Sequence, residues 1–245
     1  MKPMPNIPTD PRTLLAFGAH PDDVEFGAGG IIASEVRGGT KVHIVVCSEG
    51  ESASSGTPGQ RRQEAMRAAS ILGATIEFIA LGGDAHFERC IDSTLTVART
   101  IRRLAPRWVL CPTPNPNQHP DHAVLGSLVH DAARLARYGG VAELRDLPAH
   151  AIEQLWHYAV GPEGEPCGAG AVWYDLSDTG VVDLWKEAMT AHETQARTRC
   201  YLELQLTRAR LLGLRAGVEY AQALYPADPM LVKSLKQLGR GARQF

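Results

Sequence analysis

The sequence predicts an α/β fold: a Rossmann-like three-layer sandwich in which helices cover a mostly parallel sheet. Short apolar runs rich in β-branched residues alternate with longer segments whose apolar residues recur at helical spacing. Strands that alternate with helices imply crossover connections and therefore parallel neighbours. The composition agrees, because 44% hydrophobic and 21% charged residues are close to the average for a globular chain.

The first half of the chain carries this alternation most clearly. Glycines follow three of the four expected helices, which is a common helix C-terminal signal. The expected strands are Thr13–Phe17, Lys41–Cys47, Thr75–Leu81 and Trp108–Cys111, and the expected helices are Gly27–Val36, Arg61–Leu72, Leu95–Leu104 and Asp121–Leu135.

The second half is less regular, with expected strands at Gln154–Val160 and Val172–Leu176 and expected helices at Val181–Thr190 and Arg199–Leu214. No linker, repeat or change of composition marks a second domain. We therefore expect a single domain over residues 1–245. Its expected parts are a flexible N-terminal segment at 1–12, the core sheet and both principal motifs within 13–135, and completing strands and C-terminal helices within 150–245.

Charge and cysteine content exclude several classes of protein. A net charge of −2 leaves no basic excess for binding nucleic acid. No apolar run approaches the ~20 residues that span a bilayer, and the N-terminus lacks the apolar core of a signal peptide. Five cysteines without a C-x-x-C pair argue against a disulfide framework or a thiolate zinc site. We expect a cytoplasmic protein that contacts neither nucleic acid nor membrane.

The loop after the first strand, Ala19-His20-Pro21-Asp22-Asp23, brings an imidazole and two carboxylates to the point where a helix begins. Ligands of parallel sheets bind beyond the carboxyl ends of the strands. Imidazole and carboxylate are ordinary zinc ligands, and a second aspartate can remain free as a base. The alternative is that the two aspartates only cap the following helix.

The loop after the fourth strand carries a second histidine-rich segment, His119-Pro120-Asp121-His122. His122 at the helix start is the better candidate ligand, which would complete a two-histidine, one-carboxylate site with an open position. His119 would then face the substrate, and Asp121 would orient one of the imidazoles. Two such segments at the same edge of one sheet favour a metal site.

Together these two motifs resemble those of the zinc-dependent N-acetylglucosaminyl deacetylases of the PIG-L/LmbE type. Weaker similarity extends from Leu14 to Leu224. It includes Gly56-Thr57 with Arg61 and Glu64, the segment Tyr174–Ser177 with His192–Gln195, and Gly217 with Tyr220–Leu224.

The resemblance implies an enzyme that hydrolyses the N-acetyl amide of an amino sugar and releases acetate. It implies Zn²⁺ bound by His20, Asp23 and His122, although Fe²⁺ could use the same ligands. It implies that Asp22 activates the metal-bound water and that His119, with Asp121 behind it, stabilises the oxyanion or protonates the amine.

The resemblance also implies a substrate role for Arg61, which matches an arginine that reaches sugar hydroxyls in some members. It further implies a homo-oligomer, since many members are hexamers.

Asn117 stands near a position where some relatives use tyrosine to polarise the carbonyl. Gln222 replaces a common glutamate, with an effect that the sequence leaves open. The sequence likewise leaves the roles of His157 and His192 open. The alternatives are an amidase of the same superfamily that cleaves a thiol-sugar conjugate, and a non-catalytic sugar or nucleotide binder.

Overall fold

The computed structural model describes residues 12–116, 118–168, 170–197 and 200–242. It is built around a seven-stranded sheet. The strands are β1 (Thr13–Gly18), β2 (Lys41–Val46), β3 (Thr75–Phe78), β4 (Trp108–Pro112), β5 (Gln154–Tyr158), β6 (Val172–Asp175) and β7 (Ala221–Pro226). The α-helices are α1 (Asp23–Arg37), α2 (Pro58–Leu72), α3 (Ile91–Leu104), α4 (Pro120–Arg137), α5 (Thr179–Thr190), α6 (Glu193–Ala196) and α7 (Tyr201–Ala216).

The strands lie in the order β3-β2-β1-β4-β5-β7-β6. The five strands from β1 to β5 pair in parallel, and β7 pairs antiparallel with both β5 and β6. The chain therefore leaves β1 in one direction toward β3 and returns on the other side to β4. This reversal of direction opens a crevice between the carboxyl ends of β1 and β4, where α/β proteins bind ligands.

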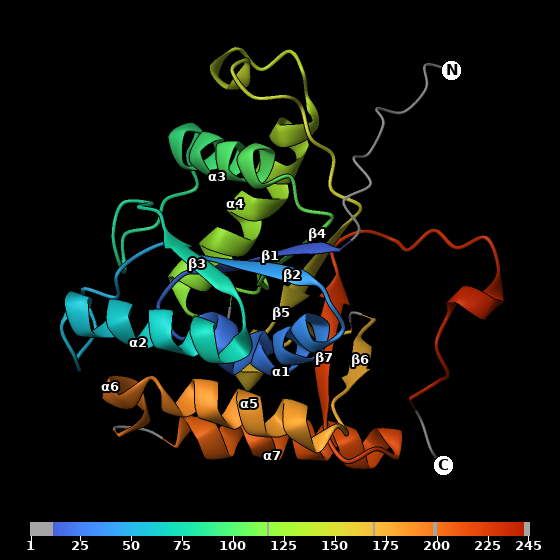
Figure 1. Cartoon of the computed structure of the whole chain (residues 1–245). Helices are drawn as coiled ribbons and strands as arrows, with labels where there is room; N and C mark the ends of the chain where they lie inside the picture. The colour runs from blue at the N-terminus through green and yellow to red at the C-terminus, as the bar shows by residue number, and fades with distance from the viewer. Residues whose placement is uncertain (1–11, 117, 169, 198–199, 243–245) are drawn as a thin grey trace.

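Helices cover both faces of the sheet, which confirms the predicted fold class. Helices α3 and α4 lie on one face and α1 and α2 on the other, with α5 and α7 packed outside α1 and α2 (Figure 1). The buried apolar side chains form one cluster on each face. No helix within the described ranges combines the length and apolar character that crossing a bilayer requires.

Three glycines of α1 allow this helix to lie unusually close to its neighbours. A Cβ at Gly27 would lie 2.3 Å from the ring of Tyr158 on β5, and a Cβ at Gly30 would lie 2.5 Å from Leu176. A Cβ at Gly29 would meet Trp185 of α5 at 2.6 Å. Gly27 thus lets α1 pack closely on β5, while Gly29 serves the contact with the outer helix layer.

The predicted elements of the first half are all present, with small differences at their ends. Helix α1 begins at Asp23, four residues before the expected start at Gly27, because the polar loop after β1 runs directly into the helix. In the second half, strand β7 and the short helix α6 were not predicted. The segment of β7, Ala-Gln-Ala-Leu-Tyr-Pro, has no β-branched residue, so only its pairing between β5 and β6 defines it as a strand.

Candidate active site

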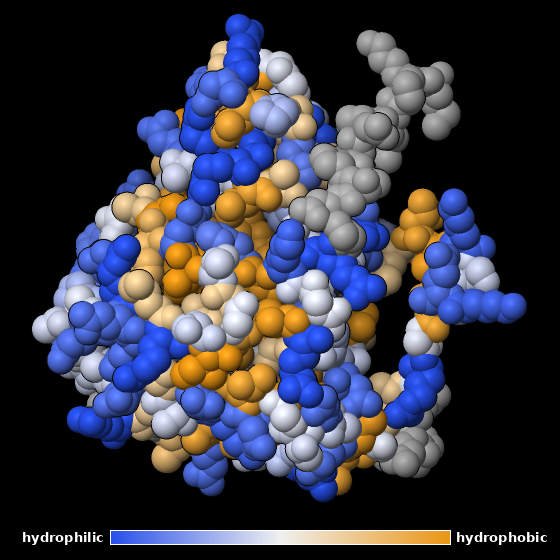
Figure 2. Space-filling view, in the orientation of Figure 1, coloured by the Kyte–Doolittle hydropathy of each residue, from blue (hydrophilic) through white to orange (hydrophobic). Residues whose placement is uncertain are grey.

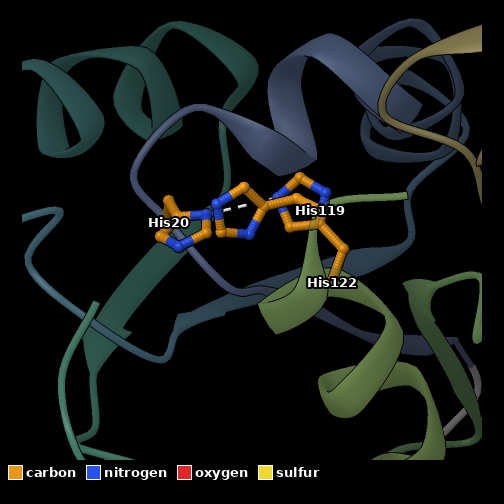
Figure 3. A group of neighbouring side chains, drawn as sticks. All are labelled: His20, His119 and His122. Carbon is orange, nitrogen blue, oxygen red and sulfur yellow. Dashed lines mark hydrogen bonds between the residues drawn. The ribbon is translucent and has the colours of Figure 1, made fainter. Parts of the chain in front are cut away.

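The two predicted histidine motifs meet at the crevice between β1 and β4. His20 follows β1, and His119 and His122 lie at the start of α4, after β4. The three imidazole rings lie side by side (Figure 3), with ring centroids 5.0 to 5.2 Å apart. The parallel pairing of β1 with β4 brings the two loops together, although their histidines are about 100 positions apart in the chain.

One ring nitrogen of His20, one of His122 and the two carboxylate oxygens of Asp23 lie close together. His20 Nδ1 lies 3.2 Å from His122 Nε2, His122 Nε2 lies 3.0 Å from Asp23 Oδ1, and His20 Nδ1 lies 3.5 Å from Asp23 Oδ2. Ligands held tetrahedrally around Zn²⁺ at its usual bond lengths are about 3.3 Å apart. All three residues are buried, so the donor set and its spacing fit a divalent cation.

The second nitrogen of His20 is held by two carboxylates. His20 Nε2 lies 3.0 Å from Asp84 Oδ1 and 3.1 Å from Asp121 Oδ2. Asp121 Oδ2 also accepts the backbone N–H of Ala85 at 2.7 Å, and Asp84 Oδ2 accepts that of Ser52 at 3.0 Å. A carboxylate on the distal N–H is the usual partner of a metal-binding histidine, because it directs the other nitrogen toward the metal.

This arrangement differs from the implied placement of Asp121 behind His119. The Asp121 carboxylate contacts His20, whereas its backbone N–H donates to His119 Nδ1 at 3.3 Å. His119 is thereby the N-cap of α4. The difference arises because Asp121 lies in the first helical turn, where its side chain turns toward the loop after β1.

The capping contact determines the tautomer of His119. Since Nδ1 accepts a hydrogen bond, a neutral His119 carries its proton on Nε2. Burial and the neighbouring imidazoles of His20 and His122 lower the pKa of His119, which favours this neutral form. A nitrogen of His119 lies within 4.8 Å of the donor atoms of the other two histidines. His119 therefore offers a hydrogen-bond donor at the edge of the metal position.

Asp22 and Asp23 occupy different environments although they are neighbours. The pKa of Asp23 is held well below its ordinary value: burial opposes this, but the contacts with His122 and His20 outweigh it. Burial, followed by repulsion from Asp23, raises the pKa of Asp22 to about 6. Asp22 occupies the N-cap position of α1 but makes no side-chain capping hydrogen bond there. The alternative that Asp22 only caps the helix is therefore not met by its side chain, and its carboxylate is not used in capping.

Arg61, the implied sugar-binding residue, is buried, with only 4% of its surface exposed. Its guanidinium donates to the carbonyls of Gly50 and Pro21 at 3.0 and 2.9 Å and lies 3.4 Å from Asp22 Oδ2. Those contacts join the loops after β1 and β2. Asn117, the other implied substrate contact, lies outside the described residues.

Sequence reasoning missed Asp84, which holds His20. Asp84 follows Gly82-Gly83 beyond β3, at the same edge of the sheet as the two motifs, and that position was the available signal. Its pKa is lowered chiefly by the contact with His20.

The residues whose roles the sequence left open lie away from the donor atoms. His192 Nε2 lies 3.5 Å from Glu25 Oε2, and both side chains are buried. His157 Nδ1 lies 3.3 Å from both Cys111 Sγ and the carbonyl oxygen of Pro112, within the sheet. Gln222 accepts the backbone N–H of Ile31 at 3.0 Å and so fastens β7 to α1.

Comparisons with known proteins identify relatives of this chain. A family profile described as PIG-L, GlcNAc-PI de-N-acetylase, matches residues 15–133, which include both histidine motifs. A 4-oxalmesaconate hydratase of Pseudomonas putida is 26% identical and aligned over 94% of this chain and 95% of its own. A 1D-myo-inositol 2-acetamido-2-deoxy-alpha-D-glucopyranoside deacetylase of Rhodococcus opacus is 25% identical over 94% of this chain and 92% of its own.

Among solved structures, a conserved protein of Thermus thermophilus superposes with a TM-score of 0.79 and 28% sequence identity. The match covers 93% of this chain and 99% of the Thermus chain. The relatives with named activities are enzymes, both deacetylases and a hydratase. The profile match over residues 15–133, the extent of these relatives and the similarity of the whole fold support one assignment, that of the chain to the PIG-L/LmbE family.

Proposed function

We propose that this protein is a metal-dependent hydrolase that removes the acetyl group from an N-acetylglucosamine-containing substrate. The observation that carries the proposal is the proximity of donor atoms from His20, Asp23 and His122 at 3.0 to 3.5 Å, with the buried Asp22 next to Asp23 in the chain. A Zn²⁺ ion held by these ligands would polarise the acetyl carbonyl and lower the pKa of a coordinated water from ~15.7 to ~7. Fe²⁺ is an alternative occupant of the same donors.

Asp22 acts as the general base in this proposal. Its raised pKa of about 6 leaves it ionised at neutral pH yet basic enough to take a proton from the attacking water. After the carbonyl carbon has been attacked, the same carboxyl returns the proton to the amide nitrogen as the carbon–nitrogen bond breaks. The products are acetate and a free amine, so that one carboxyl group serves both proton transfers.

His119 stabilises the developing oxyanion. Its Nε2–H donates toward the carbonyl oxygen, because its Nδ1 is occupied by the N–H of Asp121. The lowered pKa of His119 keeps the ring neutral, so this hydrogen-bond donor is uncharged when the substrate binds. Asp84 and Asp121 hold His20 and take no part in proton transfer.

The charge of the site favours a neutral substrate. Four aspartates are buried here: Asp23, Asp84 and Asp121 contact His20 or His122, and Asp22 precedes Asp23 in the chain. The guanidinium of Arg61 is buried and already engaged by two carbonyl oxygens and by Asp22. An uncharged N-acetyl amide can approach such a site more readily than an anion can.

A hydratase is the second candidate, because a hydratase aligns over nearly the whole chain. Addition of water to a double bond would also use a metal, a base and a proton donor. The acidic surroundings of the site disfavour a substrate that carries carboxylates. Two parallel assays separate the candidates. A deacetylase releases acetate from N-acetylglucosamine or diacetylchitobiose, whereas a hydratase removes the absorbance of the conjugated double bond of 4-oxalmesaconate.

The central experiment compares the zinc-loaded protein with protein stripped by a chelator, using primary-amine formation as the readout. The proposal is supported if amine is released from a sugar substrate, if the chelator abolishes this release and if zinc restores it. Release only from a thiol-sugar conjugate identifies the alternative amidase, and sugar binding without turnover identifies a non-catalytic binder. The variant Asp22→Asn should lower kcat by about 10²- to 10⁴-fold with zinc affinity retained. Turnover at the wild-type rate in that variant would contradict the proposed mechanism.

We further propose a cytoplasmic homo-oligomer, with six copies as the expected number. Exposed apolar side chains support association with a second copy: Leu211 and Leu214 on α7 are each 57% exposed, and Leu231 is 97% exposed. Leu231 belongs to the projecting C-terminal segment, whose surface is partly apolar (Figure 2). Five free cysteines agree with a reducing compartment. Sedimentation velocity tests the assembly, and a monomer at micromolar concentration would contradict it.

A further inference from the structure

The guanidinium of Arg61 joins two loops at the back of the site. Its Nη1 donates to the carbonyl oxygen of Gly50 in the loop after β2, and its Nη2 donates to that of Pro21 in the loop after β1. Nη2 also lies 3.4 Å from Asp22 Oδ2. One side chain from α2 therefore contacts the proposed base, the residue before it and a second loop.

Asp22 has a backbone conformation that few residues with a side chain adopt. Its φ is 119° and its ψ is −26°, outside the regions open to ordinary L-residues. Such conformations persist where surrounding contacts over-determine them. The helix that follows provides no side-chain capping hydrogen bond to Asp22, whereas Arg61 contacts both its carboxylate and the carbonyl of Pro21.

The loop after β2 encloses the guanidinium tightly. A Cβ at Gly50 would lie 2.0 Å from Arg61 Nη1 and 2.9 Å from Arg61 Nε. Gly50 itself has a φ of +68°, which favours glycine. The side chain of Arg61 is only 5% exposed, so this packing leaves little of it open to a ligand.

We infer that Arg61 is a positioning residue that holds Asp22 in its working conformation and clamps the loops after β1 and β2, and that it does not bind the substrate. The kinetic test of this role rests on the proposed function. A residue that binds the sugar uniformly raises KM when removed, whereas a residue that places the base lowers kcat.

The test uses Arg61→Gln and Arg61→Lys. Arg62→Gln is the matched control, because Arg62 is the next residue of α2, is half exposed and pairs with Glu49 of the same loop at 3.1 Å. Arg61→Gln should lower kcat by about 100-fold, which is the effect expected when a catalytic group such as the Asp22 carboxylate is slightly misplaced. Its KM should stay within about threefold of the wild-type value. Arg61→Lys keeps the positive charge but loses the forked guanidinium group, so its kcat should lie between those of Arg61→Gln and the wild type. The control Arg62→Gln should have the kcat and KM of the wild type.

A rise in KM with kcat unchanged, or no change in either constant, would overturn the inference. Gly50→Ala provides a second variant should Arg61→Gln fold poorly, because the new methyl group displaces the guanidinium while every charged side chain remains. It should reproduce the loss of kcat, and wild-type kinetics with a folded Gly50→Ala would also overturn the inference.

A crystal structure of Arg61→Gln separates this inference from the proposed function. We expect Asp22 to leave its positive φ and its carboxylate to move. An unchanged Asp22 in that structure would overturn the positioning role whatever reaction the enzyme performs. If the wild-type protein releases no amine from any sugar, the proposed function fails, and the structural comparison still decides the role of Arg61.

Discussion

His20 Nδ1 and His122 Nε2 face one another at 3.2 Å, with Asp23 against both. Two neutral imidazole nitrogens this close must either share a proton or direct their lone pairs at a cation. His122 Nδ1 is buried without a hydrogen-bond partner in the described part of the chain, so no hydrogen bond on that side holds the ring. The pair is therefore suited to a cation that accepts both lone pairs.

The first prediction is that His122→Asn lowers zinc affinity by more than about 100-fold, since even loss of a group that only orients a ligand costs 10- to 100-fold. His130→Asn is the matched control, because His130 lies two turns further along α4 and its side chain is 35% exposed. Competition with a chromogenic chelator measures both. Equal affinities of His122→Asn and the wild type would show that His122 is no ligand.

The second prediction concerns the carboxylates that hold His20. Asp84→Asn and Asp121→Asn should each weaken zinc binding by about 10- to 100-fold, because both carboxylates contact His20 Nε2. Asp131→Asn is the control, since Asp131 lies on α4 and pairs with Arg89 near the surface. Both site variants should have less than additive effects when combined, because they act on one nitrogen. Additive losses would indicate that each carboxylate acts separately.

The third prediction is a pH dependence of stability that originates at His192. This ring is buried, which by itself lowers its pKa, but Glu25, Asp22 and Glu64 face it and raise the pKa above its ordinary value. The folded protein therefore binds the His192 proton more tightly than the unfolded chain does. The stabilisation is complete below the unfolded pKa of about 6.5 and is lost as pH rises through the folded value.

Urea unfolding of the metal-free protein between pH 5.5 and 8.5 measures this effect. The excess stability of the wild type over His192→Gln should shrink as the pH rises across about 6.5 and above. Glu25→Gln should flatten the same dependence, because Glu25 is the charge nearest to His192. A difference that stays constant across the range would show that His192 is neutral in the folded protein.

The fourth prediction concerns the packing of α1. Gly27→Ala should lower the free energy of unfolding by about 1–3 kcal/mol, because its methyl group would overlap the ring of Tyr158. That ring cannot move aside easily, since it is fully buried and its hydroxyl donates to the carbonyl of Phe17 at 2.7 Å. Gly59→Ala in α2 meets nothing within 4 Å and should be neutral or stabilising by up to about 1 kcal/mol. Denaturant titration compares the two, and equal effects would contradict the packing account.

Much of the fold follows from local patterns. Apolar β-branched runs and glycine-terminated helical segments were sufficient to predict the β1 to β4 region, because each run is long enough to show its period. Strand β7 escaped prediction, since its six residues carry no strand pattern of their own. It exists because β5 and β6 present edges that it can pair with, and such pairing joins segments distant in the chain.

The sequence by itself determined that the two His-Pro-Asp segments follow strands, and hence that they meet at one edge of a parallel sheet. Only the tertiary structure decided which atoms meet. It placed Asp121 against His20 instead of His119, added Asp84 from the loop after β3, and buried Arg61 behind Asp22. The physical reason is that strand order determines which loops are neighbours, whereas the direction of each side chain depends on helix starts, caps and packing between loops that no local pattern encodes.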